Sequence, residues 1–94
     1  MSKFGFTYIL VNKHRTVFYC GVTSNLEKRV WEHKNKIHPG FTKKYNVDRL
    51  VYFEIHDSIE FAIFREKVIK KKSRMGKIKL IEFNNPSWIE LLPN

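Results

Sequence analysis

The sequence contains one cysteine, Cys20, so no internal disulfide can form. This fits a reducing compartment, and we expect a cytoplasmic protein. Long apolar runs are also lacking, because charged residues interrupt the short hydrophobic stretches. The sequence therefore indicates no transmembrane segment, signal peptide or lipidation site. Linkers, repeats and low-complexity segments are absent too, which predicts a single domain over residues 1–94 and no membrane partner.

Acidic residues are scarce. Nine Asp and Glu face eighteen Lys and Arg, which gives a formal net charge of +9 and is typical of a protein that binds a polyanion. Nucleic acid is the leading candidate, and an acidic membrane surface is the alternative. Hydrophobic residues make up 43% of the chain, enough for one modest core. We expect a monomer, because no long exposed apolar stripe is left outside that core.

Three segments are rich in β-branched and aromatic residues and are predicted to be strands: 4–11, 17–22 and 49–56. The polar segment 12–16 predicts a turn that joins the first two strands into a hairpin. The third strand is apolar on both faces, so we place it at the centre of the sheet.

Helical patterns fill the segments between and after the strands. Ser24 and Asp57 are each followed three residues later by glutamate, the spacing of a capping box, so we place two helix starts there. Thr42 is the predicted cap of a short helical turn. The fold class is α+β, and the predicted helices cover residues 24–36, 41–45, 58–74 and a short last segment after the loop 84–88.

Two polar side chains share the apolar face of the first helix. At 100° per residue, one stripe holds Leu26, Arg29, Val30, His33 and Ile37. Arg29 and His33 could bind a phosphate there, since arginine offers a planar fork of donors and histidine a donor or an acceptor. The alternative is a tilted helix that lets both side chains reach solvent.

Glu66 lies among apolar residues of the third predicted helix. Carboxylates are rarely buried without a partner, and Mg²⁺ prefers oxygen ligands, so Glu66 is a candidate metal ligand. An ion pair with Arg65, Lys70 or Arg29 is the alternative. Basic residues around and after it would hold phosphates without reading sequence; they are Lys67, Lys70, Lys71, Lys72, Arg74 and Lys77.

Two tyrosines and a glycine complete the candidate site. Tyr8 and Tyr19 could transfer protons if a cation and a metal lowered the phenol pKa from about ten, or they could pack with their hydroxyls at the rim of the core. Gly21 could let a phosphate approach the backbone, or it could serve close packing or a bulge. Combined with the helical residues, these groups suit the hydrolysis of a phosphodiester.

The order and spacing of these residues resemble those of the GIY-YIG nucleases, in particular the small single-domain bacterial type, which is similar to the nuclease module of structure-selective endonucleases. Neither named triplet is literal, but both tyrosines and the second glycine remain. The resemblance covers nearly the whole chain and rests on Thr7-Tyr8-Ile9-Leu10, Tyr19-Cys20-Gly21-Val22-Thr23, Leu26-x-x-Arg29 with His33, Phe41-Thr42-x-x-Tyr45, Leu50-Val51-Tyr52-x-Glu54, Ala62-x-x-x-Glu66-Lys67-x-Ile69-Lys70 and Asn85-Pro86-x-Trp88.

This resemblance implies a three-stranded antiparallel sheet flanked by helices, and metal-dependent hydrolysis of nucleic acid. Glu66 would hold one Mg²⁺ or Mn²⁺, and Arg29 would clamp the scissile phosphate. The two tyrosines would orient and deprotonate the attacking water, and which of them is the base is left open. The positions that match catalytic ones in the family are Tyr8, Tyr19, Arg29, His33, Glu66 and Asn85.

We therefore expect a metal-dependent endonuclease that cuts branched or structured DNA in repair or recombination, since we see no separate domain for reading sequence. RNA is not excluded as a substrate, because a site that contacts phosphates has no obvious means to reject the 2′-hydroxyl. The alternative is a nucleic-acid-binding module that keeps the nuclease fold and needs a protein partner to supply its substrate.

Overall fold

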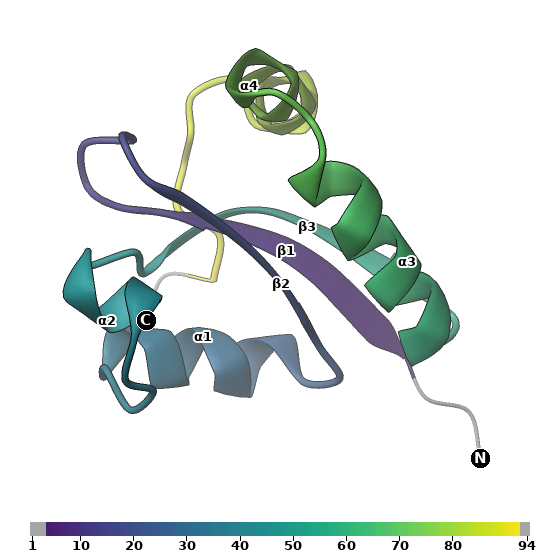
Figure 1. Cartoon of the computed structure of the whole chain (residues 1–94), viewed down its shortest axis with the longest axis horizontal. Coiled ribbons are helices and arrows are strands. Elements are labelled where there is room, and N and C mark those ends of the chain that lie inside the picture. Colours follow the sequence, from purple (N-terminus) through teal and green to yellow (C-terminus); the bar gives the residue numbers. More distant parts are fainter. Residues whose placement is uncertain (1–3, 93–94) are drawn as a thin grey trace.

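A computed structural model describes residues 4–92; residues 1–3 and 93–94 of the predicted domain lie outside the described part. The predicted α+β class, a three-stranded antiparallel sheet flanked by helices, is confirmed. The described residues form, in order, β1 (Gly5–Val11), β2 (Phe18–Thr23), α1 (Leu26–Lys34), α2 (Phe41–Lys44), β3 (Arg49–His56), α3 (Ile59–Lys70) and α4 (Arg74–Asn84) (Figure 1).

The central strand of the sheet is β1, and the strand order is β2-β1-β3. The prediction that the third strand is central was therefore wrong, because β3 lies at an edge. Apolar side chains on both faces of a strand indicate that other layers cover both faces. They do not indicate how many strands pair with it. Both β1 and β3 meet the first condition, and only β1 has a strand on each side.

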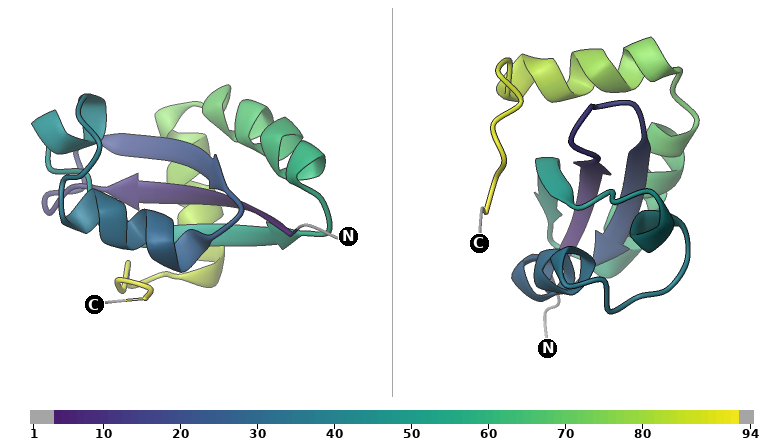
Figure 2. Two further views of the ribbon diagram at one scale, coloured as in Figure 1. Left: turned by 90° about the horizontal axis from the view of Figure 1, so that it is seen from below. Right: turned by 90° about the vertical axis from the view of Figure 1, so that its left-hand side faces the viewer.

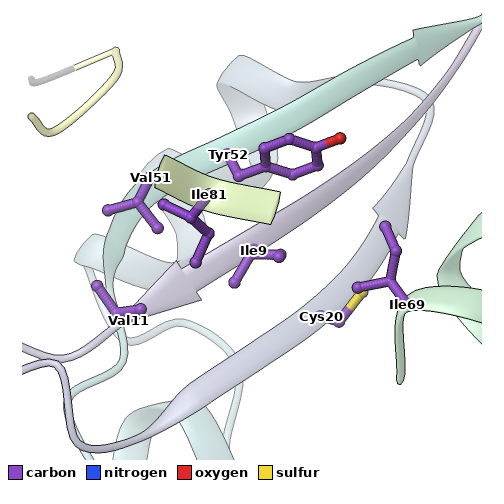
Figure 3. Close-up of a cluster of buried hydrophobic side chains, with 7 residues drawn as sticks. All are labelled: Ile9, Val11, Cys20, Val51, Tyr52, Ile69 and Ile81. Atoms are coloured by element: carbon purple, nitrogen blue, oxygen red, sulfur yellow. The ribbon is translucent and has the colours of Figure 1, made fainter. Parts of the chain in front are cut away.

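Helices cover both faces of the sheet, α1 and α2 on one side and α3 and α4 on the other (Figures 1 and 2). Successive residues of β1 therefore enter two separate cores. On the α3–α4 side, Ile9 and Val11 pack with Ile69 of α3 and Ile81 of α4 (Figure 3). The buried members of the core on the α1 side are Tyr8, Leu10, Leu26, Val30, Val47 and Leu50.

Two helix starts lie one residue later than predicted. Asn25, not Ser24, caps α1, and its side chain accepts a hydrogen bond of 3.1 Å from the backbone N–H of Lys28. Ser58, not Asp57, caps α3 in the same way. Each predicted site had a second capping residue directly after it, and the side chain that reaches the third N–H of the helix fixes the start.

The remaining helices also differ from the prediction. α2 has Gly40 as its N-cap, and Thr42 lies inside the helix with its side chain buried. The predicted long third helix ends at Lys70 and a separate helix, α4, follows, because Ser73 caps a new start. Residues 85–92 form no helix, so the predicted short last helix is absent from them.

Close packing fixes α3 against the central strand. A Cβ atom at Gly5 would lie 2.8 Å from both the Cβ of Ala62 and the Cα of Ile59, so the absence of a side chain lets the helix approach. The Thr7 hydroxyl donates a 2.8 Å hydrogen bond to the Ala62 carbonyl. These contacts set the place of α3 along the sheet. None of the helices formed by residues 4–92 is long and apolar enough to cross a membrane.

Candidate active site

The two tyrosines meet beside Gly21 on the α1 face of the sheet. Tyr8 on β1 pairs in register with Gly21 on β2. The rings of Tyr8 and Tyr19 have centroids 6.3 Å apart. A Cβ atom at position 21 would lie 2.5 Å from the Tyr8 hydroxyl oxygen and 2.9 Å from the Tyr19 ring. These distances support the close-packing role of Gly21: the glycine leaves the space that the Tyr8 hydroxyl occupies.

Replacing Gly21 with alanine is therefore expected to displace Tyr8. We expect a stability loss of about 1–3 kcal/mol, the usual cost of overpacking, and a fall in cleavage rate on the order of 100-fold from a misplaced catalytic group. Thermal unfolding and a cleavage assay measure the two effects. Gly76→Ala is the matched control, because the nearest atoms to its Cβ are side-chain atoms of Lys72 and Ser73 at 3.3 Å, and not a tyrosine hydroxyl at 2.5 Å as at position 21. Equal behaviour of the two variants would refute this role.

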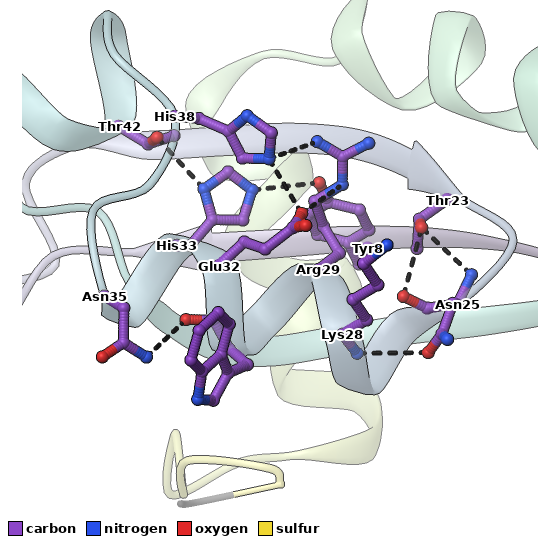
Figure 4. A network of polar contacts seen from close by, with 11 residues as sticks. Tyr8, Thr23, Asn25, Lys28, Arg29, Glu32, His33, Asn35, His38 and Thr42 are labelled. Atoms are coloured by element: carbon purple, nitrogen blue, oxygen red, sulfur yellow. Dashed lines mark hydrogen bonds and ion pairs between the residues drawn. The ribbon is translucent and has the colours of Figure 1, made fainter.

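His33 links Tyr8 to α2. Its Nε2 lies 3.3 Å from the Tyr8 hydroxyl and its Nδ1 lies 3.1 Å from the Thr42 hydroxyl (Figure 4). Burial, with smaller effects from the positive charges of Arg29 and His38, lowers the pKa of His33 to about 4. The imidazole is therefore neutral at neutral pH, with one nitrogen able to donate and the other to accept. Tyr8 is 1% exposed, and burial raises its pKa above the usual value.

The lowered pKa of His33 gives a testable pH dependence of stability. The unfolded chain, with a histidine pKa near 6.5, binds the proton more tightly than the folded chain, with a pKa near 4. The contribution of His33 to the free energy of unfolding is fully present above about pH 6.5. It is lost as the pH falls toward 4, and at pH 5 the loss is about 2 kcal/mol. Urea unfolding at pH 7.5 and pH 5 measures this difference. In His33→Gln the difference should disappear; an unchanged pH dependence would contradict the assignment.

Arg29 lies at the rim of this cluster, with its side chain 35% exposed. Its Nη1 is 3.2 Å from Nε2 of His38, and the same His38 nitrogen is 2.8 Å from a Glu32 carboxylate oxygen (Figure 4). That nitrogen either accepts from Arg29 or donates to Glu32. The bond to His38 is the main cause that lowers the Glu32 pKa. The guanidinium is therefore held in place while one side stays open to solvent.

The predicted stripe of α1 holds in part. Leu26, Val30 and His33 are buried, and Arg29 borders them. Ile37 is 55% exposed, because α1 ends at Lys34 and the helical spacing does not extend to it. Sequence reasoning missed three polar residues that the fold brings to the cluster, namely Glu32, His38 and Thr42. Only Glu32 had a local signal, its position three residues after Arg29.

Glu66 lies on the other side of the sheet, on α3. Its carboxylate is 15% exposed and forms an ion pair of 2.6 Å with Lys70, one of the partners that the sequence allowed. The backbone carbonyl of Glu66 is 3.9 Å from the Cys20 sulfur of β2. Burial, followed by the charge of Glu66, raises the Cys20 pKa to about 11. Glu66 therefore borders the edge strand β2 at Cys20, and Tyr19 is the residue before Cys20 on that strand.

A hollow at the β2 edge joins the two sides of the sheet. It has a volume of about 260 Å³. Tyr19 and Phe41 border it from the α1 side, and Lys70 and Lys77 border it from the α3–α4 side. Lys70, which pairs with Glu66, thus lines the same hollow as Tyr19. The Glu66 carboxylate does not touch Arg29 or the tyrosines directly among the contacts of residues 4–92.

The donor set suits a cation that completes its shell with substrate. Residues 4–92 hold no cluster of three His, Cys, Asp or Glu side chains that could bind a metal. Mg²⁺ is commonly held by one or two carboxylates together with water and substrate phosphates. A single partly exposed carboxylate at Glu66 fits that mode, provided that Lys70, whose side chain is 55% exposed, swings aside. It does not fit a closed cage of protein ligands.

A second polar cluster, which sequence analysis missed, fixes the position of α3. Arg65 donates two hydrogen bonds to the Glu54 carboxylate, at 2.8 and 2.6 Å, and not to Glu66. Tyr52 and His56 also contact Glu54. These bonds outweigh the opposing effect of burial and lower the Glu54 pKa to about 2. Arg65 is thereby tied to β3 at one edge of the sheet, while the adjacent Glu66 faces the β2 edge.

The basic residues predicted to bind nucleic acid have different surroundings. Lys70 and Lys77 border the hollow. Arg74 donates to the backbone carbonyls of Arg15 and Thr16 and lies 4.7 Å from the Phe18 ring centroid, so it fastens α4 to the hairpin turn. The exposed remainder of the group is Lys67, Lys71 and Lys72.

Asn85 does not join the cluster. It is buried, and its amide donates to the carbonyls of Val51 and Ile89 at 3.0 and 2.9 Å and accepts from the Ile89 N–H. These bonds tie the segment after α4 to β3, the edge strand opposite β2. They give Asn85 a structural role, and the catalytic role that the motif predicts stays a prediction.

Comparison with known proteins agrees with this fold. A model of the GIY-YIG catalytic domain matches residues 4–79. The chain belongs to the GIY-YIG family, as the resemblance predicted, and the family indicates a nuclease-like function on a nucleic-acid substrate.

Relatives of similar length carry the name UPF0213 protein. The chain is 41% identical over 85 residues to the one from Syntrophus aciditrophicus, which covers 89% of this chain and 95% of the relative. It is 40% identical over 76 residues to one from Clostridium perfringens, covering 81% of each. The solution NMR structure of the UPF0213 protein from Bacillus halodurans is similar, with a TM-score of 0.58, 26% identity, and coverage of 90% and 89% of the two chains.

Proposed function

We propose that this protein is a divalent-metal-dependent endonuclease that hydrolyses phosphodiester bonds of DNA. The observation that supports this most is the meeting of Tyr8, Tyr19 and His33 beside an arginine that is fixed but open to solvent. A chemically inert core has no need to hold these groups together. A phosphodiesterase can use them to take a proton from water, to orient that water and to bind the phosphate.

Arg29 would bind the scissile phosphate. Its guanidinium offers a planar fork that matches two phosphate oxygens, and His38 and Glu32 hold it in position. Positive charge fixed where the transition state gathers negative charge lowers the barrier without reorganisation.

The proton of the attacking water would leave through Tyr8 and His33. A free tyrosinate at Tyr8 is disfavoured, because burial raises the Tyr8 pKa. If the Tyr8 hydroxyl gives its proton to His33 Nε2 as it takes one from water, no anion forms on the tyrosine and His33 becomes an imidazolium. Burial disfavours that charge, as the low His33 pKa records, so the negative charge of the bound phosphate would have to offset it. Tyr19 is half-buried and borders the hollow, so its hydroxyl would orient the water.

Glu66 would hold one Mg²⁺ or Mn²⁺. When bound, such a cation neutralises charge on the phosphate and stabilises the leaving oxygen. Lys70 would exchange its ion pair with Glu66 for a contact with a flanking phosphate, and Lys77 would add a second such contact. Both lysines line the hollow already.

The experiment is a cleavage assay with the purified chain. Labelled duplex, flap, junction and single-stranded DNA, and matching RNA, are incubated with Mg²⁺, Mn²⁺ or EDTA. We expect metal-dependent cleavage, with branched or structured DNA preferred over plain duplex. The absence of cleavage of every substrate in either metal would refute the proposal. A cytoplasmic location and a role in repair or recombination stay predictions.

A partner-dependent binding module is the second candidate. The ion pair between Glu66 and Lys70 favours it, since the only carboxylate proposed as a ligand is already neutralised. Under this alternative, DNA binding persists in EDTA and turnover is absent. The Glu66→Gln variant should then bind DNA as the wild type does.

A further inference from the structure

Two aromatic rings stand exposed on the single turn of α2. Phe41 begins this helix and Tyr45 follows its last residue; they are 48% and 43% exposed. Their ring centroids are 5.0 Å apart. Large aromatic side chains normally contribute to a core. This pair lies on the surface beside the proposed active site, and no role described so far uses it.

The pair continues a row of rings that begins inside the site. Tyr8 is buried, and Tyr19 follows it with a centroid distance of 6.3 Å. Phe41 stacks on Tyr19 at 6.5 Å with an angle of 30° between the planes, and Tyr45 follows. The row thus leads from the proposed catalytic tyrosines to solvent. Tyr19 in turn lies beside His33, with ring centroids 5.7 Å apart, so a group bound on Phe41 would be linked through these two rings to the cluster that holds Arg29.

The turn that carries these rings is firmly anchored. Between them, Thr42 is buried and contacts His33 Nδ1 at 3.1 Å. The Thr42 carbonyl accepts a 2.9 Å hydrogen bond from the N–H of Val47, a residue that is 0% exposed. The exposed rings therefore sit on a fixed turn, which reduces the entropy lost when a ligand stacks on them.

Cations surround the rings. The Lys44 ammonium lies 5.3 Å from the Tyr45 ring centroid. Lys70 and Lys77 border the hollow together with Phe41. Aromatic faces among positive charges suit a ligand with both a flat π-surface and phosphates, which is a nucleotide strand. A lipid tail or an apolar peptide would gain nothing from these cations.

We propose that Phe41 and Tyr45 form a stacking subsite for an unpaired nucleobase next to the scissile phosphate, so that the substrate is single-stranded or carries an unpaired nucleotide at the cut. This inference rests on the proposed function. Inside a duplex both faces of a base are covered by neighbouring bases, so a base must be unpaired or at a duplex end to stack on a protein ring. The subsite selects for strand state and not for sequence, because every base has a π-face.

The test measures binding separately from cleavage. A short labelled single strand and the matching duplex are titrated with the protein in EDTA, and fluorescence anisotropy gives the Kd. Phe41→Ala and Tyr45→Ala should each weaken single-strand binding by about 5- to 100-fold, the range for one lost base–aromatic stack. Duplex binding should change less than about twofold. Phe83→Ala is the matched control, since Phe83 on α4 is 85% exposed.

A nucleotide without its base, combined with the protein variants, gives a double-mutant cycle between the base and the ring. Moving one abasic position along the unpaired arm of a duplex–single-strand junction, which fixes the register, should reveal a place where wild-type binding weakens to the level of Phe41→Ala, and the variant should not respond to that position. Circular dichroism and thermal unfolding establish that each variant folds. If Phe41→Ala does not fold, Phe41→Leu takes its place. It keeps the apolar bulk, lacks a π-face and should weaken binding as well.

The outcomes separate this inference from the proposed function. Selective loss of single-strand binding by a chain that cuts nothing would support the subsite and refute the nuclease. Equal losses for single strand and duplex, no loss in either ring variant, or no single-strand binding by the wild type would overturn the subsite. Cleavage that persists in those cases would leave the nuclease proposal standing.

Discussion

The substitution Glu66→Gln is expected to lower kcat for DNA cleavage by about 1,000-fold, because a cation at the scissile phosphate is worth several kcal/mol of transition-state stabilisation. Glutamine keeps the size of the side chain and removes the charge that would hold Mg²⁺. Single-turnover cleavage over a range of Mg²⁺ concentrations measures the effect. The loss should not be recovered at high Mg²⁺ concentration.

The fold should tolerate this change. The lost contact is an i,i+4 pair between Glu66 and the largely exposed Lys70, and such pairs contribute at most a few tenths of a kcal/mol. Glu60→Gln is the control, since it removes an exposed carboxylate from the first turn of the same helix. Lys70→Gln breaks the same ion pair and keeps Glu66. Cleavage by Glu66→Gln within tenfold of the Glu60→Gln rate would contradict a metal role.

The substitution Arg29→Lys is expected to lower kcat by about 100-fold, the usual effect of removing one donor that stabilises the transition state. Lysine keeps the positive charge and loses the planar fork. His38 and Glu32, which hold the guanidinium, would no longer fix the donor. The effect should therefore lie mainly in kcat, with Kd for DNA within a few-fold of wild type.

The neighbouring residue provides the control for Arg29. Lys28 is exposed on the same helix, so Lys28→Ala removes one positive charge without touching the tyrosine cluster. This variant should change Kd slightly and leave kcat unaltered. If Arg29→Lys and Lys28→Ala behave alike, Arg29 contributes only to the general positive charge of the surface.

Local patterns were enough to predict most of the elements. All three strands, the two helices α1 and α3 and the short turn α2 lie within a few residues of their predicted bounds. Strand composition, capping residues and helix-breaking Pro39-Gly40 act over a few neighbours, so they are visible in the chain itself. The errors follow the same logic, since adjacent residues such as Ser24 and Asn25 can each cap a helix, and Ser73 competes with the continuation of α3.

Long-range pairing was outside the reach of those patterns. The edge position of β3 depends on which strand meets which, and an apolar strand satisfies either place. The partners of Arg29 and Glu54 come from a loop and another helix. Asn85 has the motif of a catalytic residue, yet its hydrogen bonds hold the segment after α4 on β3.

The sequence by itself determined the family, the two-faced sheet and the candidates Tyr8, Tyr19 and Arg29, because these depend on residue type and local spacing. The tertiary structure decided which candidates meet. It placed His33 between Tyr8 and Thr42, and set Glu66 on the far face of the sheet, bordering β2 beside Lys70. The reason is physical: a side chain's partners are set by the packing of whole layers, and no local pattern encodes that.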